Sequence, residues 1–332
     1  NIVSNNTYDK AWDLMQSNES DSAFYYFNVA KQEFIEDGDQ LGAGKALMNS
    51  AIIQADGGDY FGSEESCILA LKYLYEAKDT EYLVSTYNAI AISRKNLKDF
   101  RTALNWYEKA FQTSKDSLEK VAISSNIAVA NTKLGEYNTS IKIFENLLNS
   151  RISDKNQKIK AKIVDNLAFT KFLQSKNYNA EPELDEALKI RVNEEDLWGQ
   201  NASHAHLADY FAEKNPEKSL VHAHKMYELA KKLKSPDDQI EALQKLVNLE
   251  NTANSKRYFR KYLLLNDSLQ TARNKAKNQY ALIRYDTEKN RADFLKSEAR
   301  IIEKSYQLLQ RNIALAIALI AMILGVFWYK KR

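Results

Sequence analysis

The chain has few residues that break helices and no pair of cysteines that could cross-link it. Among its 332 residues are nine glycines and three prolines, a composition that disfavours a fold of many tight turns and favours helices joined by short connections. Cys67 is the only cysteine, so an intrachain disulfide and a metal site built from cysteines are both excluded. A single thiol does not decide between a reducing and an oxidising compartment.

Motifs of catalysis are also missing. The sequence has no phosphate loop, nucleophile elbow, zinc-protease helix or dinucleotide fingerprint. Its four histidines form two His-Ala-His triplets, and residues two apart on a helix point in different directions, so each triplet can offer a metal one ligand at most. We therefore expect no enzyme activity, no cofactor and no metal, with packing or surface roles for His204, His206, His222 and His224.

Charge is unevenly distributed along the chain. Residues 256–311 contain 14 Lys+Arg and 6 Asp+Glu, a net charge of +8, and residues 330–332 add +3. This leaves 30 basic and 38 acidic residues, a net of −8, for residues 1–255. An acidic region argues against nucleic-acid binding by this portion of the chain. The basic segment suits anionic lipid headgroups, and ordinary helix solubility explains it equally well.

The C-terminal end contains one long apolar run. Residues 313–329 have no charged or amide side chain, and 17 residues make roughly 25 Å of helix, the short end of what spans a bilayer. The run ends in the aromatic residues Trp328 and Tyr329, and the basic residues Lys330, Lys331 and Arg332 follow at once, as is typical of a membrane interface with a cytoplasmic side. The alternative, a buried core helix, would need a partner on every face. We predict a transmembrane helix at 313–329 and a cytoplasmic segment from 330.

The first residue is Asn rather than Met. Either a signal peptide has been removed or the chain was shortened in another way. Removal of a signal peptide would place the region before the span outside the cytoplasm.

A repeated pattern runs through the first 265 residues. A small residue is followed at +4 by a bulky one and at +7 by a small or apolar one, which places the three on one helix face. The pattern occurs at Ala23, Phe27 and Ala30; Ser63, Cys67 and Ala70; Ala103, Tyr107 and Ala110; Ser140, Phe144 and Leu147; and Ala223, Tyr227 and Ala230. A turn lies just before each such helix, and an earlier helix with its own small residue lies before the turn. The small residues of these earlier helices are Ala51, Ala91, Ala128, Ala168 and Ala208.

This series, together with the stretch Leu134-Gly135-Glu136-Tyr137, resembles the tetratricopeptide repeat. The resemblance implies an all-α, right-handed superhelical α-solenoid of six to seven helix pairs over residues 7–265. The fifth unit, around Tyr178 and Glu181, is degenerate. Ala23, Ser63, Ala103, Ser140, Glu181 and Ala223 are spaced by 40, 40, 37, 41 and 42 residues, against a usual period of about 34, so we expect lengthened helices or turns. A solenoid of another repeat type is the alternative.

In such an array the first helix of each pair forms a concave wall. The resemblance implies a wall that includes Met48, Ile52, Asn88, Ile92, Ser125, Val129, Phe169 and Phe172. These residues are largely apolar, and the lysine and asparagine pattern that clamps a terminal carboxylate in some members is not cleanly present. We therefore expect the groove to bind a peptide, an amphipathic helix or an apolar segment of a partner protein. The alternative is that the same residues simply pack inside a tight superhelix.

A helical stalk is expected over residues 266–312, which contain neither Pro nor Gly. A lone helix of this length would not stay ordered, so it should pack on the array or on a second chain as a homodimer. Residues 272–289, the charged helix and the span resemble the region before the membrane helix in tetratricopeptide regulators of Bacteroidetes-type bacteria. That resemblance implies periplasmic repeats, one inner-membrane helix and a cytoplasmic helix-turn-helix or kinase part beyond this chain.

The sequence therefore predicts a non-enzymatic sensor region of a single-pass membrane protein in signal transduction or transcription regulation. A ligand in the groove would be relayed through the stalk and span. The alternative function is a tail-anchored cytosolic scaffold on a membrane surface.

Overall fold

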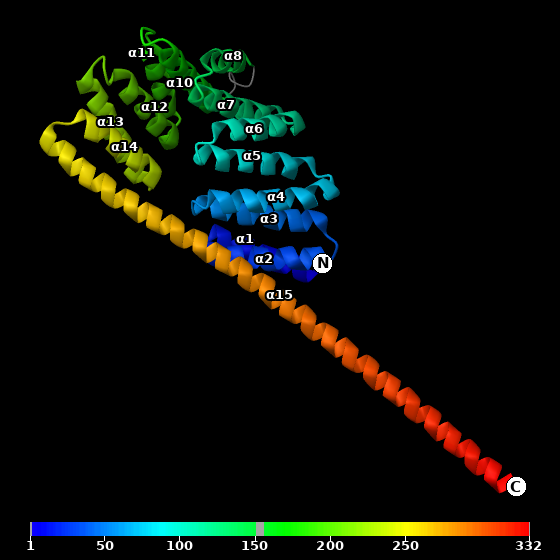
Figure 1. Ribbon diagram of the computed structural model, residues 1–332. Coiled ribbons are helices and arrows are strands. Elements are labelled where there is room, and N and C mark those ends of the chain that lie inside the picture. Colours follow the sequence, from blue (N-terminus) through cyan, green and yellow to red (C-terminus); the bar gives the residue numbers. More distant parts are fainter. Residues whose placement is uncertain (1, 151–155, 332) are drawn as a thin grey trace. The chain divides into compact units, whose positions relative to one another are not determined.

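The computed structural model describes residues 2–150 and 156–331, which form 14 α-helices without any strand (Figure 1). The first eight are α1 (Ile2–Gln16), α2 (Ser20–Glu36), α3 (Gln40–Asp56), α4 (Tyr60–Ala77), α5 (Thr80–Asn96), α6 (Phe100–Thr113), α7 (Ser117–Lys133) and α8 (Tyr137–Leu148). The others are α10 (Gln157–Gln174), α11 (Glu181–Asn193), α12 (Leu197–Phe211), α13 (Pro216–Lys232), α14 (Pro236–Leu249) and α15 (Thr252–Lys331).

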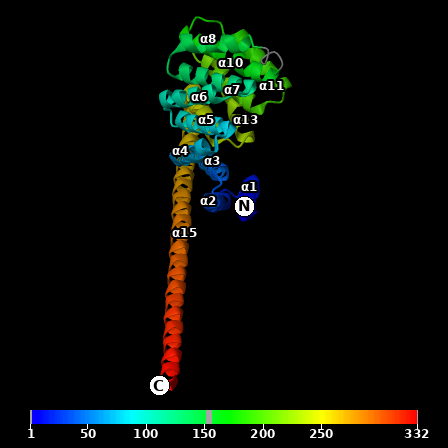
Figure 2. The same cartoon turned by 90° about the vertical axis from the view of Figure 1, so that its right-hand side faces the viewer.

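The helices pack as consecutive pairs. Each of α1 to α14 contacts the next helix along the chain, and pairs stack in chain order (Figures 1 and 2). The first helices of neighbouring pairs also contact each other: α3 contacts α5, α7 contacts α10, and α10 contacts α12. Such nearest-neighbour stacking defines a solenoid, which confirms the predicted all-α fold class.

A 20-residue helix-and-turn unit explains the long period. Helix-capping aspartates recur at Asp39, Asp59, Asp79 and Asp99, and each carboxylate accepts a hydrogen bond, 2.8–3.1 Å long, from the backbone N–H three residues on. The residue before each aspartate has a positive φ, as Gly38 and Gly58 at +72° and +80° or as Lys78 and Lys98 at +58° and +62°. Helix, left-handed turn and cap thus take 20 residues, and a pair takes 40.

The predicted small residues lie where the two helices of a pair cross. Ala23, Ser63, Ala103 and Ser140 are at most 1% exposed. At two crossings the small residue is a serine whose hydroxyl donates to the facing helix: Ser140 Oγ to the carbonyl of Ala128 at 2.8 Å, and Ser219 Oγ to that of Ala208 at 2.7 Å. The close approach of the helices therefore depends on a side chain this small.

The register of two units differs from the prediction. In the fifth unit Ala180, Leu184 and Ala187 are fully buried, whereas Glu181 is partly exposed, so the small residue is one position earlier than expected. In the sixth unit the crossing serine is Ser219, four residues before Ala223. Ser219 and Ala223 are both small and buried, so the repeat spacing alone does not decide which of them lies at the crossing. With these positions the intervals after Ser140 are 40 and 39 residues, close to the earlier ones.

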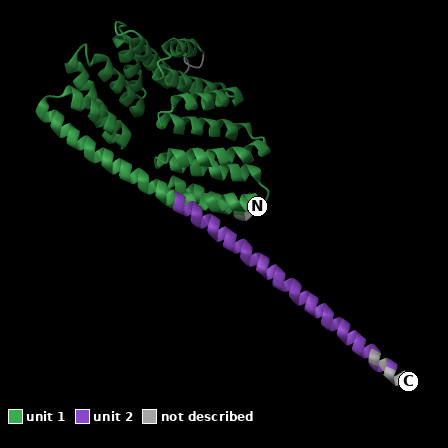
Figure 3. Ribbon diagram, viewed as in Figure 1, with its two compact units in different colours: residues 1–280 green, residues 281–332 purple. Residues whose placement is uncertain are grey.

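The chain divides into two compact units, residues 1–280 and 281–332 (Figure 3). The helix α15 contributes to both. The predicted boundaries at 265/266, 312/313 and 329/330 all lie within this one helix, so no break in secondary structure marks them.

Within the first unit, α15 connects the last helix pair to the first two pairs. The Arg273 guanidinium lies 2.6 Å from a carboxylate oxygen of Asp237 in α14 and 3.4 Å from the hydroxyl of Tyr60 in α4. The Tyr280 ring is buried, with its centroid 4.8 Å from that of Phe24 in α2. The stalk residues up to 280 therefore pack on the array, one of the two arrangements expected.

Two glycines in the α3–α4 turn permit this contact. A Cβ atom on Gly57 would lie 2.9 Å from Tyr280 Oη, and one on Gly58 would lie 2.5 Å from Arg273 Cγ. Since side chains cannot approach so closely, larger residues at this turn would displace α15.

In the second unit, apolar side chains are exposed along the helix. Examples are Leu282, Phe294, Ile301, Leu308, Ile317 and Leu319. Among the described residues, α15 is the one helix whose length and composition would allow it to cross a membrane. So much exposed apolar surface indicates that lipid or protein covers it.

The capping account predicts the effect of substitutions at Asp39. Asp39→Ala removes the acceptor for the N–H of Gly42 and should lower the free energy of unfolding by about 1 kcal/mol. Asp39→Asn keeps an acceptor oxygen and should lower the free energy of unfolding by only a few tenths of a kcal/mol. Urea unfolding of the full chain in detergent, followed by far-UV circular dichroism, measures both. Equal losses in the two variants would contradict the assignment of a cap.

Candidate ligand-binding groove

The eight predicted wall residues come in pairs from four first helices. The pairs lie on α3 (Met48, Ile52), α5 (Asn88, Ile92), α7 (Ser125, Val129) and α10 (Phe169, Phe172). Five are half-buried, and Ser125, Phe169 and Phe172 are buried. Partial exposure on successive first helices suits a wall that a ligand could contact.

Two of the eight meet in a small cavity. Val129 of α7 and Phe169 of α10 line a hollow of about 50 Å³, together with Thr132, Lys133, Asn166, Thr170 and His206. The cavity thus gathers residues of three consecutive first helices, α7, α10 and α12. It combines an apolar surface with an amide, an ammonium and an imidazole, which suits one side chain of a ligand.

A buried carboxylate holds His206 in this cavity. The imidazole stacks on Phe169 with ring centroids 4.0 Å apart, and its Nδ1 lies 2.8 Å from Asp165 Oδ2. Asp165 is fully buried and also accepts a hydrogen bond from Arg191 at 3.1 Å. Burial raises the pKa of Asp165, but the charges and hydrogen bonds of His206 and Arg191 outweigh it and lower the pKa below its usual value. The carboxylate therefore stays ionised and fixes the imidazole, whose Nε2 is left for another partner.

Phe169 and Phe172 belong to the same buried cluster, but Phe172 does not line this cavity. Its ring packs edge-on against Tyr210 of α12 with centroids 5.0 Å apart, and the ammonium groups of Lys176 and Lys214 lie 4.1 and 5.2 Å from its centre. The ring belongs to the core between α10 and α12. Replacing it with a charged residue would therefore disturb packing as well as any ligand contact.

Two wall residues carry buried polar atoms that lack partners among the described residues. These atoms are Asn88 Oδ1 and Ser125 Oγ. An unsatisfied buried polar group costs about 1–3 kcal/mol, and a ligand that supplies a hydrogen bond would remove that cost. Their place on adjacent first helices makes them candidate contacts to a peptide backbone.

Sequence reasoning missed the polar half of this site. Lys133 and Asn166 line the cavity but were not among the predicted wall residues, and His206 was expected to have a packing or surface role. Helix spacing could have found the first two, because Lys133 follows Val129 by four residues and Asn166 precedes Phe169 by three. The link from His206 to Asp165, 41 residues earlier, has no local signal.

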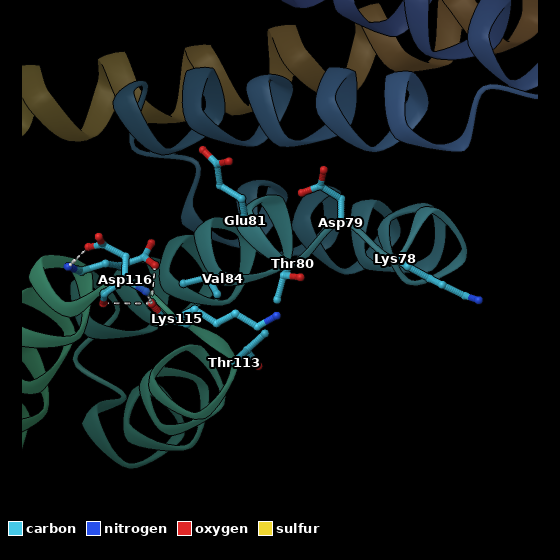
Figure 4. Close-up of a pocket in the computed structure, with 10 residues that line it drawn as sticks. Lys78, Asp79, Thr80, Glu81, Val84, Thr113, Lys115 and Asp116 are labelled. Atoms are coloured by element: carbon cyan, nitrogen blue, oxygen red, sulfur yellow. Dashed lines mark hydrogen bonds between the residues drawn. The ribbon is translucent and has the colours of Figure 1, made fainter.

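A larger hollow lies elsewhere, between the turn before α5 and the turn before α7 (Figure 4). It measures about 740 Å³ and none of the eight predicted residues lines it. Its polar groups largely cap helices. Asp79 Oδ1 accepts from the N–H of Tyr82 at 2.9 Å, and Asp116 Oδ1 accepts from that of Glu119 at 2.6 Å. These groups are used by the fold, so the hollow is a weaker candidate for a site.

Searches with the sequence against protein-family models and against curated proteins gave no match. Solved structures are similar in fold. Apo RapI has a TM-score of 0.66 at 15% identity, covering 81% of this chain and 99% of its own. A Rap protein complexed with Competence and Sporulation Factor has a TM-score of 0.61 at 14% identity, covering 80% of this chain and 75% of its own. The Rap conjugation gene regulator of plasmid pLS20, in complex with the Phr* peptide, has a TM-score of 0.57 at 10% identity, covering 79% of this chain and 73% of its own.

These likenesses, at such low identity, concern the fold. Together with the paired helices they confirm the expected class, an all-α solenoid of the tetratricopeptide type. The three solved structures named above are all of Rap proteins.

A second histidine pair leads to a test of pH dependence. His204 of α12 and His222 of α13 have their Nδ1 atoms 2.9 Å apart. Burial lowers the pKa of each to about 4. Both rings therefore stay neutral in the folded chain near pH 6, whereas unfolded histidines, with a pKa of about 6.5, take up protons.

Between pH 6.5 and 4 the unfolded chain binds more protons at these two residues than the folded chain does. The free energy of unfolding should therefore fall as pH is lowered through this window. The double variant His204→Asn and His222→Asn, whose amides can still bond each other, should show a shallower fall. Urea midpoints at half-unit pH steps measure the slope, and identical slopes would show that the pair does not titrate in this way.

Proposed function

We propose that residues 7–265 bind a peptide or a helical segment of a partner protein in the concave groove, as the sensor part of a membrane signalling protein. The wall would comprise the eight residues on α3, α5, α7 and α10. The observation that carries this proposal is the cavity shared by α7, α10 and α12, with an oriented imidazole beside Val129 and Phe169. Two structures of the same fold are complexes with a factor or a peptide, which supports the same use of the groove here.

The membrane part of the proposal places residues 313–329 across a bacterial inner membrane. The exposed apolar side chains of this segment and the basic residues after it support this placement. The repeats would then be periplasmic and the segment from 330 cytoplasmic. A regulatory or kinase part joined beyond it would receive the signal.

The relay would use α15, which is one helix from the last pair to the span. Its contacts to Phe24 and Tyr60 depend on the spacing between the first and last pairs of the array. A ligand that changes the curvature of the array would change that spacing and so the packing of α15. The exposed apolar residues of 281–312 also make the stalk a candidate for homodimerisation.

Substitutions at Asn88 and Ser125 test the groove without damaging the core. Both carry unsatisfied atoms, so Asn88→Ala with Ser125→Ala should leave the urea midpoint unchanged or raise it. The same double variant should lose about tenfold in affinity for peptides enriched by the wild-type chain in nanodiscs from a random dodecapeptide phage library. Fluorescence anisotropy of synthetic copies of those peptides measures the affinity.

A matched control replaces two exposed polar residues of second helices, Asn105→Ala in α6 and Thr139→Ala in α8. The control should bind these peptides as the wild type does. Unchanged binding by the groove variant, or enrichment of no peptide, would contradict the proposed function.

Orientation has a separate test. Protease added to cells with a permeabilised outer membrane should digest the repeats, because the proposal puts them in the periplasm. A cytosolic scaffold would stay protected until the inner membrane is lysed. Immunoblotting with an antibody against the array distinguishes the two results.

A further inference from the structure

The exposed face of α4 carries an unusual amount of apolar surface for a helix of the array. Four large apolar side chains of this helix are between 45% and 59% exposed: Phe61, Ile68, Leu69 and Tyr75. Among the described residues of α1 to α14, no other helix exposes more than two such side chains. Phe61, Ile68 and Tyr75 are seven residues apart, so these three and the adjoining Leu69 form one strip along the helix, the α4 stripe.

The repeat itself shows that the fold does not need apolar residues at these positions. In α6, the equivalents of Phe61, Ile68 and Leu69 lie 40 residues later and are exposed and charged: Arg101, Glu108 and Lys109. In α8 the equivalents lie 77 residues after those of α4, and they are exposed and polar: Asn138, Glu145 and Asn146. The stripe is therefore an addition to the repeat, as expected of a surface that binds a partner.

Charged residues give the stripe a symmetric pattern. Glu65 precedes Ile68 by three residues and Lys72 follows it by four, both exposed on the same helix face. A two-fold axis through Ile68, relating two antiparallel copies of α4, would place Glu65 opposite Lys72 to within one residue's rise, about 1.5 Å. The same axis would place Phe61 opposite Tyr75. The stripe is thus complementary to a second copy of itself in charge and in apolar surface.

We propose that the chain associates with a second copy of itself through the α4 stripe, as a symmetric dimer with Ile68 on its axis. Burial of the apolar side chains favours association, and two Glu65–Lys72 pairs fix the antiparallel register. Tyr75 is already held for this contact, because its hydroxyl is hydrogen-bonded to that of Tyr87 in α5. The interface lies on a second helix, so it goes beyond the proposed groove of the first helices and beyond the stalk contact of 281–312.

Oxidative cross-linking of the full chain in membranes tests the position of the axis. A residue on a two-fold axis meets its own copy, so Ile68→Cys should form a disulfide-linked dimer on a non-reducing gel after mild oxidation. The wild type should stay monomeric on the gel, because Cys67 is buried. Glu108→Cys is the matched control, since Glu108 is exposed at the equivalent position of α6, and it should also stay monomeric.

Charge reversal in the Ile68→Cys chain tests the register. Adding Glu65→Lys sets lysines opposite lysines and should lower the cross-linked fraction about tenfold. Adding Lys72→Glu as well restores opposite charges and should restore the cross-linked fraction.

Replacing apolar residues of the stripe tests its contribution. In the Ile68→Cys chain, Phe61→Arg with Leu69→Lys copies the residues that α6 carries at these positions. The chain should therefore keep the far-UV circular dichroism of the wild type while the cross-link is lost.

Absence of a cross-link in Ile68→Cys, or equal cross-linking of Glu108→Cys, would overturn the inference. A cross-linked product with a protein of another mass would assign the stripe to a different partner and would also overturn it. So would a cross-linked fraction that Lys72→Glu fails to restore. Peptide binding in the groove is measured separately, so each of these results leaves the proposed function standing.

Discussion

The close crossing of two helices within each pair is the contact on which the array depends. No single pair encloses a core, so each apolar face must be buried against a neighbour. The crossing needs a side chain no larger than Ala or Ser, and where serine is used its hydroxyl bonds the facing carbonyl, as between Ser140 and Ala128. The capped helix-and-turn unit of 20 residues sets the sequence interval between crossings. Together these two features fix which residues of every first helix face the concave side.

The proposed groove follows from that arrangement, and so does the contact of α15 with the array. First helices contact each other across units, which brings α7, α10 and α12 to one cavity. The last helix begins after α14 and contacts the first pairs through Arg273 and Tyr280. Burial raises the pKa of the Tyr280 hydroxyl to about 12, in keeping with a ring enclosed by the array. The same helix continues into the apolar segment, and under the proposed relay it would carry a change in the array along the chain.

Local pattern was sufficient to predict the helix pairs, because spacing of three, four and seven residues depends only on the geometry of one helix. It also predicted Val129 and Phe169 as wall residues, since equivalent repeat positions face the same side, and the two line one cavity. Local pattern could not show that Phe169 lines the cavity and Phe172 does not. Phe172 packs against Tyr210 of the next first helix, and helix spacing does not predict that contact.

The polar part of the groove was beyond local reasoning for a different reason. The Asp165, Arg191 and His206 network joins three helices, α10, α11 and α12, through contacts between residues 26 and 41 positions apart in the chain. In the fifth and sixth units, adjacent small residues fitted two registers, and only the crossing contacts identified Ala180 and Ser219.

The central claim is that a ligand lies against the first helices of the array. Hydrogen–deuterium exchange of the full chain in nanodiscs, with and without a bound library peptide, tests it most directly. We expect slower exchange in α5, α7, α10 and α12, and little change in α6, α8 and α11. Protection confined to the second helices, or to the turns before α5 and α7, would place the ligand elsewhere and contradict the account.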